Sequence, residues 1–142
     1  MRPHRAALGA LLVGEAWAAL IGARLLMALP YRVWRAWVTR MMGESADGAP
    51  DGGARAVVWA LERARRAVPG TTCLTRALAA GWMLRRRGQR ARLIIGVKAA
   101  GGRLDAHAWL ELGGAVIVGG EAEVGRYARM SEPGQVGGMV FR

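Results

Sequence analysis

The sequence predicts an α+β domain in which N-terminal helices are followed by one further helix packed on a small antiparallel sheet. Apolar residues recur at helical spacing up to about residue 87. From residue 91 onward, short β-rich stretches are separated by Gly-Gly pairs, which favour tight hairpin turns. Helices followed by antiparallel strands indicate an α+β architecture. The chain has 142 residues, 53% of them hydrophobic, so we expect one compact domain with a real core.

Residues 6–29 are predicted to form the first helix, an apolar run interrupted by Glu15 and Arg24. A membrane-spanning helix needs about 20 mostly apolar residues, and a charged residue in mid-span costs about 3 kcal/mol. The basic start is similar to that of a signal peptide, but Glu15 breaks the apolar stretch and no clean small-residue cleavage site follows. We therefore expect a helix that packs on the domain or lies on a membrane surface.

Two more helices are predicted before the cysteine of this chain. Pro30 ends the first helix, and residues 31–42 then place valines and tryptophans at helical spacing. Residues 43–53 are rich in Gly, Asp, Ser and Pro, which is typical of a linker. Residues 54–68 form the third predicted helix, which ends at a Pro-Gly pair.

A fourth helix is predicted to start at Cys73, the sole cysteine. Thr71 or Thr72 can serve as its N-cap, because a threonine hydroxyl accepts a hydrogen bond from an amide that the helix leaves unpaired. The helix is expected to run to about Arg87, with Gly88 as a suitable C-terminal cap. Cys73 therefore lies in the first turn of a helix.

Three strands are predicted after this helix, and the second of them carries His107. Their ranges are 91–97, 104–112 and 115–118, with turns at 101–102 and 113–114. The Gly-rich tail from residue 121 onward gives no clear prediction.

Cys73 and His107 form the layout of a cysteine acyl-transfer site. The thiolate is the nucleophilic form, and the positive end of a helix dipole and a nearby imidazolium both lower the pKa of a thiol. His107 on a facing strand can act as general base and then as general acid. The backbone N–H of Cys73 can donate to an oxyanion. One cysteine builds neither a disulfide framework nor a multi-thiol zinc site, so we expect no metal and no cofactor.

The chain carries a net charge of +11, almost wholly from arginine, because Lys98 is the only lysine. A basic surface attracts polyanions. However, no nucleic-acid-binding module is recognisable, and Phe or Tyr do not alternate regularly with the arginines. We therefore expect a solvated basic face rather than a nucleic-acid site, with peripheral membrane contact left open.

Four motifs together resemble the B2 proteins of lasso-peptide biosynthesis, which are leader peptidases of the transglutaminase-like, papain-related fold. The motifs are CLTRALA at 73–79, LRRRG at 84–88, IGV at 95–97 and AHAWLE at 106–111. The resemblance covers nearly the whole chain. It implies an N-terminal helical segment at 1–45 and a transglutaminase-like catalytic core at 54–142, within one compact domain.

The resemblance implies a cytoplasmic cysteine protease that removes the leader from a ribosomally made precursor peptide. Cys73 matches the family nucleophile, and His107 matches the general base and acid. The implied partners are the precursor peptide, a separate B1 protein that presents the leader, and an asparagine-synthetase-like cyclase that closes the freed amine onto an acidic side chain.

The chain departs from the family pattern at the third catalytic residue. The pattern has an aspartate on the strand after the histidine, whereas the last aspartate here is Asp105. Counting back from a tight turn at 113–114 pairs His107 with Gly120 and places Glu121 beside it. Glu121 is therefore the first candidate, Asp105 the second, and a solvent or backbone acceptor the third.

Two other functions are compatible with the same residues. Transglutaminase-like members also carry out amide transfer or cross-linking, which uses the same thiolate. Alternatively, the chain is a basic scaffold that binds a peptide or a membrane surface, with Cys73 only a core residue.

Overall fold

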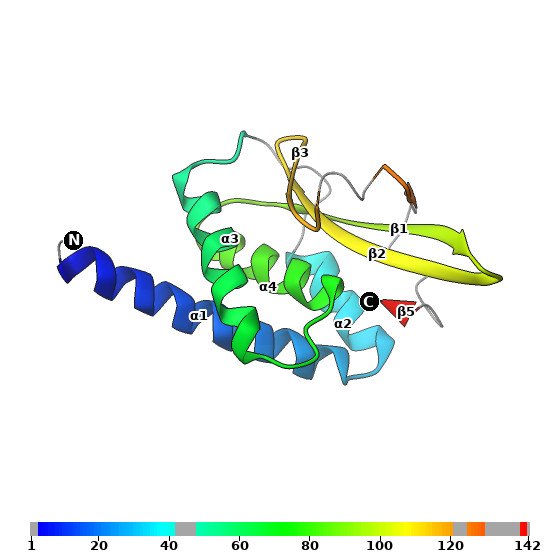
Figure 1. Cartoon of the computed structure of the whole chain (residues 1–142), viewed down its shortest axis with the longest axis horizontal. Coiled ribbons are helices and arrows are strands. Elements are labelled where there is room, and N and C mark those ends of the chain that lie inside the picture. The colour runs from blue at the N-terminus through cyan, green and yellow to red at the C-terminus, as the bar shows by residue number, and fades with distance from the viewer. Residues whose placement is uncertain (1–2, 42–47, 121–124, 130–139, 142) are drawn as a thin grey trace.

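The computed structural model describes residues 3–41, 48–120, 125–129 and 140–141, and it confirms the α+β fold class. The helices gather on one side of a sheet whose long hairpin extends past them (Figure 1). The helices are α1 (Pro3–Met27), α2 (Tyr31–Met41), α3 (Gly52–Ala64), the 3₁₀ turn Arg65–Ala67 and α4 (Cys73–Arg86). The strands are β1 (Arg92–Ala100), β2 (Arg103–Leu112), β3 (Ala115–Val118), β4 (Ala128–Arg129) and β5 (Val140–Phe141).

The sheet has the order β3-β2-β1-β4, and these neighbours are all antiparallel. The strand β5 is short and pairs in parallel with β2. In the β1–β2 hairpin, Gly96 lies opposite His107. The β2–β3 pairing contains a register shift between Leu110 and Glu111, so one extra residue separates their partners in β3.

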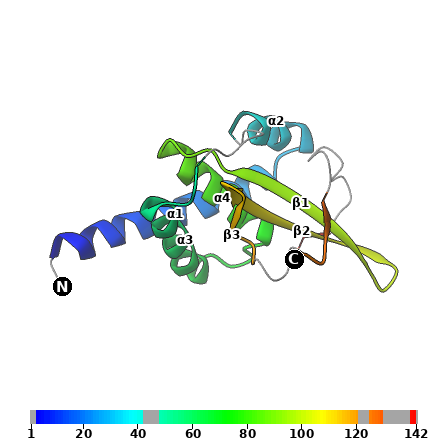
Figure 2. The same cartoon turned by 90° about the horizontal axis from the view of Figure 1, so that it is seen from above.

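The helix α4 is the centre of the domain, because it packs on α1 and α3 as well as on the sheet. Leu20 of α1, Val57 of α3, Leu74 of α4 and Leu110 of β2 are each fully buried in this shared core. Seen from above, α4 lies between α1 and the β1–β2 hairpin (Figure 2). The N-terminal helix is therefore built into the same core as the sheet.

Most predicted elements are confirmed with shifts of a few residues at their ends. The third helix starts at Gly52 rather than residue 54, because the Asp51 side chain accepts a hydrogen bond from the amide of Ala54 and caps it. It also ends earlier, at Ala64, and continues as a 3₁₀ turn. The sequence did not predict β4 and β5, which lie in the Gly-rich tail.

Candidate active site

Cys73 is the first residue of α4, and Thr72 is its N-cap. The Thr72 hydroxyl accepts the amide hydrogen of Thr75 at 3.3 Å, and the Thr75 hydroxyl accepts that of Thr72 at 2.8 Å. This reciprocal capping box fixes where the helix begins. The other candidate cap, Thr71, instead donates to the carbonyl of Val68 at 2.7 Å.

The Cys73 thiol is buried and touches the main chain of β2. The amide of Ala108 donates to Sγ over 3.5 Å. Two bonds separate that nitrogen from the Cα of His107, so Sγ lies within about 6 Å of that Cα. The fold therefore brings together the helix start and the strand that carry the two predicted catalytic residues.

Burial raises the pKa of the Cys73 thiol above its ordinary value. The amides of Ala108, Leu74 and Cys73 itself, together with the charge of Arg76, favour the thiolate but do not outweigh desolvation. The sequence predicted a lowered pKa from the helix dipole, and the sign of that prediction is wrong. The helix start does supply the donors, but the sequence did not show how deeply the thiol is buried.

Arg76 lies three residues after Cys73, and its positive charge lowers the pKa of the thiol. Its side chain is paired with a residue of α3. It forms an ion pair with Glu62, which also accepts a hydrogen bond from Arg65 at 2.6 Å. Because Glu62 neutralises much of its charge, Arg76 assists the thiolate only modestly. No local pattern in the sequence indicates this pair, because the two residues lie on separate helices.

His107 is half-buried on β2, and its Nε2 lies 2.7 Å from the carbonyl oxygen of Gly119. A carbonyl can only accept, so Nε2 must carry the hydrogen. In the neutral ring, Nδ1 is then the basic nitrogen. The backbone of the β3 end thus orients the imidazole, the role that a third catalytic residue has in such sites.

Two aromatic rings enclose the imidazole. Trp109 stacks on it with ring centroids 6.0 Å apart, and Tyr127 lies 5.2 Å away. The Tyr127 hydroxyl donates to Asp105 at 3.1 Å, and the ammonium of Lys98 lies over the Tyr127 ring and 3.8 Å from Asp105. Asp105, the second candidate for the third residue, therefore holds the tyrosine that covers His107.

Trp109 is anchored from its far side. It is fully buried, and its indole N–H donates to Glu111 at 3.0 Å. Arg129 of β4 donates to the same carboxylate oxygen at 2.6 Å, and its guanidinium lies over the Trp109 ring. Alternation along β2 puts the side chains of His107, Trp109 and Glu111 on one face. This row packs the histidine against a rigid support.

Two glycines make room for these rings. A Cβ on Gly96 would come within 2.7 Å of both Trp109 and Tyr127. A Cβ on Gly119 would lie 2.5 Å from the Cβ of Trp109, and Gly119 has φ +113°, where side chains are rarely tolerated. The hydrogen bond between His107 and the carbonyl of residue 119 therefore requires a glycine at that position.

Glu121, the first candidate for the third residue, lies outside the described residues, and its role stays a prediction. The register count that selected it is altered by the bulge opposite Leu110, which shifts the β3 chain by one residue. The backbone acceptor, third in the sequence-based order, is what the structure places on Nε2. Because side chains alternate along a strand, the sequence could have placed Trp109 beside His107. Tyr127 could not be placed in this way, because it follows a segment with no predictable register.

Within the described part of the chain, no group of three His, Cys, Asp or Glu side chains is placed to hold a metal ion. The nucleophilic and basic groups around Cys73 and His107 suit acyl transfer through a thiol.

A helix that begins at a buried cysteine and packs on an antiparallel strand bearing a histidine is the arrangement expected of a transglutaminase-like α+β domain. A family profile described as the transglutaminase-like superfamily matches residues 17–132, most of the chain. The chain belongs to this superfamily, whose members are usually cysteine peptidases or acyltransferases. Comparisons with curated proteins and with solved structures give no match.

Proposed function

We propose that this protein is a cysteine protease that cleaves the leader peptide from a ribosomally made lasso precursor. One observation carries the proposal: the sulfur of Cys73 at a helix start accepts the amide of Ala108, next to a histidine whose Nε2 is fixed by Gly119. The AHAWLE motif around His107 and the CLTRALA motif around Cys73 point from the superfamily to leader peptidases.

The chemistry follows from the atoms in place. Nδ1 of His107 takes the proton of the thiol while Sγ attacks the carbonyl carbon of the scissile bond. The oxygen of the tetrahedral intermediate accepts a hydrogen bond from the backbone N–H of Cys73. His107 then gives the proton to the leaving amine, which frees the N-terminus of the core peptide. Water, deprotonated by the same imidazole, hydrolyses the thioester to the leader carboxylate and the thiol.

The raised pKa of Cys73 affects the first step of this reaction. Because burial favours the neutral thiol, we expect the proton to leave as the sulfur attacks rather than beforehand. His107 is then needed as a base in every turnover.

The net charge of +11 supports a role for acidic partners. In the proposed pathway the chain acts with a B1 protein that binds the leader. An asparagine-synthetase-like cyclase then uses the freed amine. The arginine-rich surface would speed encounter with an acidic leader or with either protein.

The test is cleavage of the cognate precursor, with B1 present, by Cys73→Ala and His107→Ala, read by mass spectrometry. The chain has only two histidines, and His4 is exposed on α1, so His4→Ala is a matched control. We expect both site variants to lose cleavage while keeping the parental circular dichroism and Tm, and the His4 variant to cleave normally.

Two results would contradict the proposal. Cleavage by Cys73→Ala would show that the thiol is not the nucleophile. A single product heavier than the precursor, in place of two fragments, would show amide transfer or cross-linking instead of hydrolysis.

A further inference from the structure

Helix α1 exposes more apolar surface than is expected of a helix that only packs into the core. Leu8, Leu11 and Leu25 are 65%, 72% and 66% exposed. The first turns of α1 extend beyond the rest of the domain in both views (Figures 1 and 2). Residues His4–Met27 are long and apolar enough to cross a membrane, yet only 22% of the most apolar stretch is buried in the protein. A large exposed apolar surface marks an interaction site.

Four of the exposed small and apolar residues of α1 follow one line along the helix. Leu11, Ala18, Gly22 and Leu25 are seven, four and three residues apart, which keeps them on one face. This line continues past the helix end to Leu29, which is 47% exposed.

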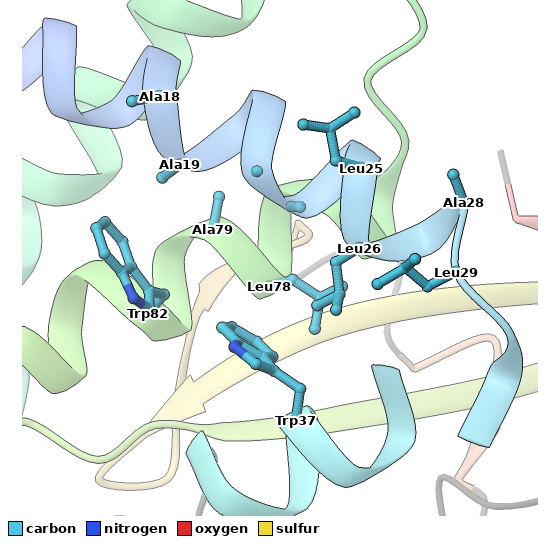
Figure 3. Close-up of a pocket in the computed structure, with 12 residues that line it drawn as sticks. Ala18, Ala19, Leu25, Leu26, Ala28, Leu29, Trp37, Leu78, Ala79 and Trp82 are labelled. Carbon is cyan, nitrogen blue, oxygen red and sulfur yellow. The ribbon is translucent and has the colours of Figure 1, made fainter. Parts of the chain in front are cut away.

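The same line of residues borders an apolar groove between α1, α2 and α4. The groove has a volume of about 710 Å³ and is lined only by alanine, glycine, leucine and tryptophan side chains. In Figure 3, Leu26 of α1 and Leu78 of α4 point towards Trp37 of α2. Trp82 of α4 also lines the groove. Tryptophan at the edge of an apolar surface is typical of a membrane interface, where the ring lies at headgroup level.

Arginines flank the groove. Arg40 is three residues after Trp37, so it lies on the same face of α2. Arg86 is four residues after Trp82, and its guanidinium lies 4.9 Å from the centre of that ring. Glu15 is the one acidic residue in the described parts of α1 and α2, and Arg87 binds it at 2.7 Å. This face is therefore apolar in the middle and cationic at its rim.

The packing of α1 favours a helix that lies on a membrane over one that crosses it. Ala16 and Leu20 are fully buried against the domain, and Glu15 is tied to α4 through Arg86 and Arg87. Crossing a bilayer would break these contacts and leave the core of α3 and α4 uncovered. An interfacial helix keeps one face on the protein and presents the other to lipid.

We propose that the face formed by α1, α2 and α4 docks on an anionic phospholipid membrane. The leucines of α1 enter the boundary between headgroups and acyl chains, the groove accommodates acyl-chain ends, and Arg40 binds lipid phosphates. The charge of the rim selects this occupant over a neutral apolar helix. The proposal is independent of the proposed peptidase activity.

The first test is co-sedimentation of the full chain with vesicles of phosphatidylcholine alone or mixed with phosphatidylglycerol. We expect binding to the anionic vesicles that falls at least tenfold for Leu8→Gln/Leu11→Gln. Leu104→Gln is the matched control, because Leu104 is a 58% exposed leucine on the β1–β2 hairpin, away from this face. Because all three leucines are exposed, neither variant should change the Tm.

The second test concerns charge. Arg40→Gln should weaken binding several-fold, whereas Arg103→Gln, an exposed arginine on the same control hairpin, should not. Binding should also fall when salt rises from about 0.1 M to about 1 M, where the Debye length shrinks from about 10 to about 3 Å. Absence of binding to anionic vesicles, or equal binding by the Leu8/Leu11 variant and its control, would overturn the proposal. So would self-association that Leu8→Gln/Leu11→Gln abolishes without any vesicle binding, or resistance to alkaline extraction, which would indicate insertion.

Discussion

Gly119→Ala is the substitution that tests most directly how the imidazole is held. A methyl group at this position would lie 2.5 Å from the Cβ of Trp109, whereas non-bonded carbons prefer about 3.5–4.0 Å. Trp109 is fully buried between His107 and Glu111 and has little room to yield. The loop must therefore move by about 1 Å, the difference between the two distances.

This movement breaks the hydrogen bond on His107. Nε2 and the Gly119 oxygen are 2.7 Å apart, and about 1 Å more takes them past the limit of about 3.2 Å. A bond to the imidazolium formed during turnover is worth about 1.5–3 kcal/mol, and each 1.36 kcal/mol is about tenfold in rate. We expect kcat for precursor cleavage to fall about 10- to 100-fold. KM should change little, because Gly119 acts on His107 and not on the peptide.

The matched control is Gly114→Ala. Gly114 also has a positive φ, +80°, in the neighbouring β2–β3 turn, but a Cβ there has nothing within 4 Å. Both variants carry the backbone strain of a side chain at positive φ, about 1–2 kcal/mol. Gly119→Ala adds the clash with Trp109, so its Tm should fall further, and the rates are compared well below both Tm values. Steady-state kinetics of the two variants side by side isolates the effect on the imidazole. A Gly119→Ala enzyme with the kcat of Gly114→Ala would refute the assignment of Gly119 as the acceptor that orients His107.

Two further predictions concern reactivity and stability. Because burial raises the pKa of Cys73, its thiolate fraction at neutral pH is low, and alkylation by iodoacetamide should be slow at pH 7. In a pH series followed by mass spectrometry, the alkylation rate should reach half its maximum at a higher pH for Cys73 than for free glutathione. A midpoint at a lower pH than that of glutathione would contradict this prediction. Leu20→Ala, which removes a fully buried side chain of α1, should lower the free energy of unfolding by about 2–5 kcal/mol in urea titrations. Leu8→Ala, 65% exposed on the same helix, should stay within about 0.5 kcal/mol, and equal losses for both would show that α1 is not part of the core.

The helix that carries Cys73 was predictable because its signals are local. A Pro-Gly stop, a threonine cap and a C-terminal glycine all lie within a few residues of its ends, and the structure uses Thr72 as the cap. The hairpin with His107 was predictable for the same reason, since Gly101 and Gly102 turn the chain within two residues. Such features require no knowledge of distant parts of the chain.

The residue opposite His107 on the following strand could not be fixed from the sequence, because it depends on register. A bulge in the β2–β3 pairing places Val118 opposite Leu110, where an unbroken register counted from the turn places residue 117. The two-residue strand β4, which places Arg129 on Glu111, has no pattern long enough to recognise. The sign of the Cys73 pKa shift was missed because burial depends on tertiary packing against β2, whereas the helix dipole is visible in the sequence.

The thiol at the start of α4 and the carbonyl bonded to the imidazole together determine when the reactive pair forms. Burial favours the neutral thiol of Cys73. The Gly119 carbonyl fixes Nδ1 as the base of His107, but it is uncharged and stabilises an imidazolium less than a carboxylate would. Burial of the thiol therefore disfavours a thiolate–imidazolium pair before substrate binds, and the uncharged carbonyl offsets less of that cost than a carboxylate would. Under the proposed function, the reactive pair therefore forms only when a peptide carbonyl is present to accept the sulfur, so leader presentation by B1 would control reactivity as well as affinity.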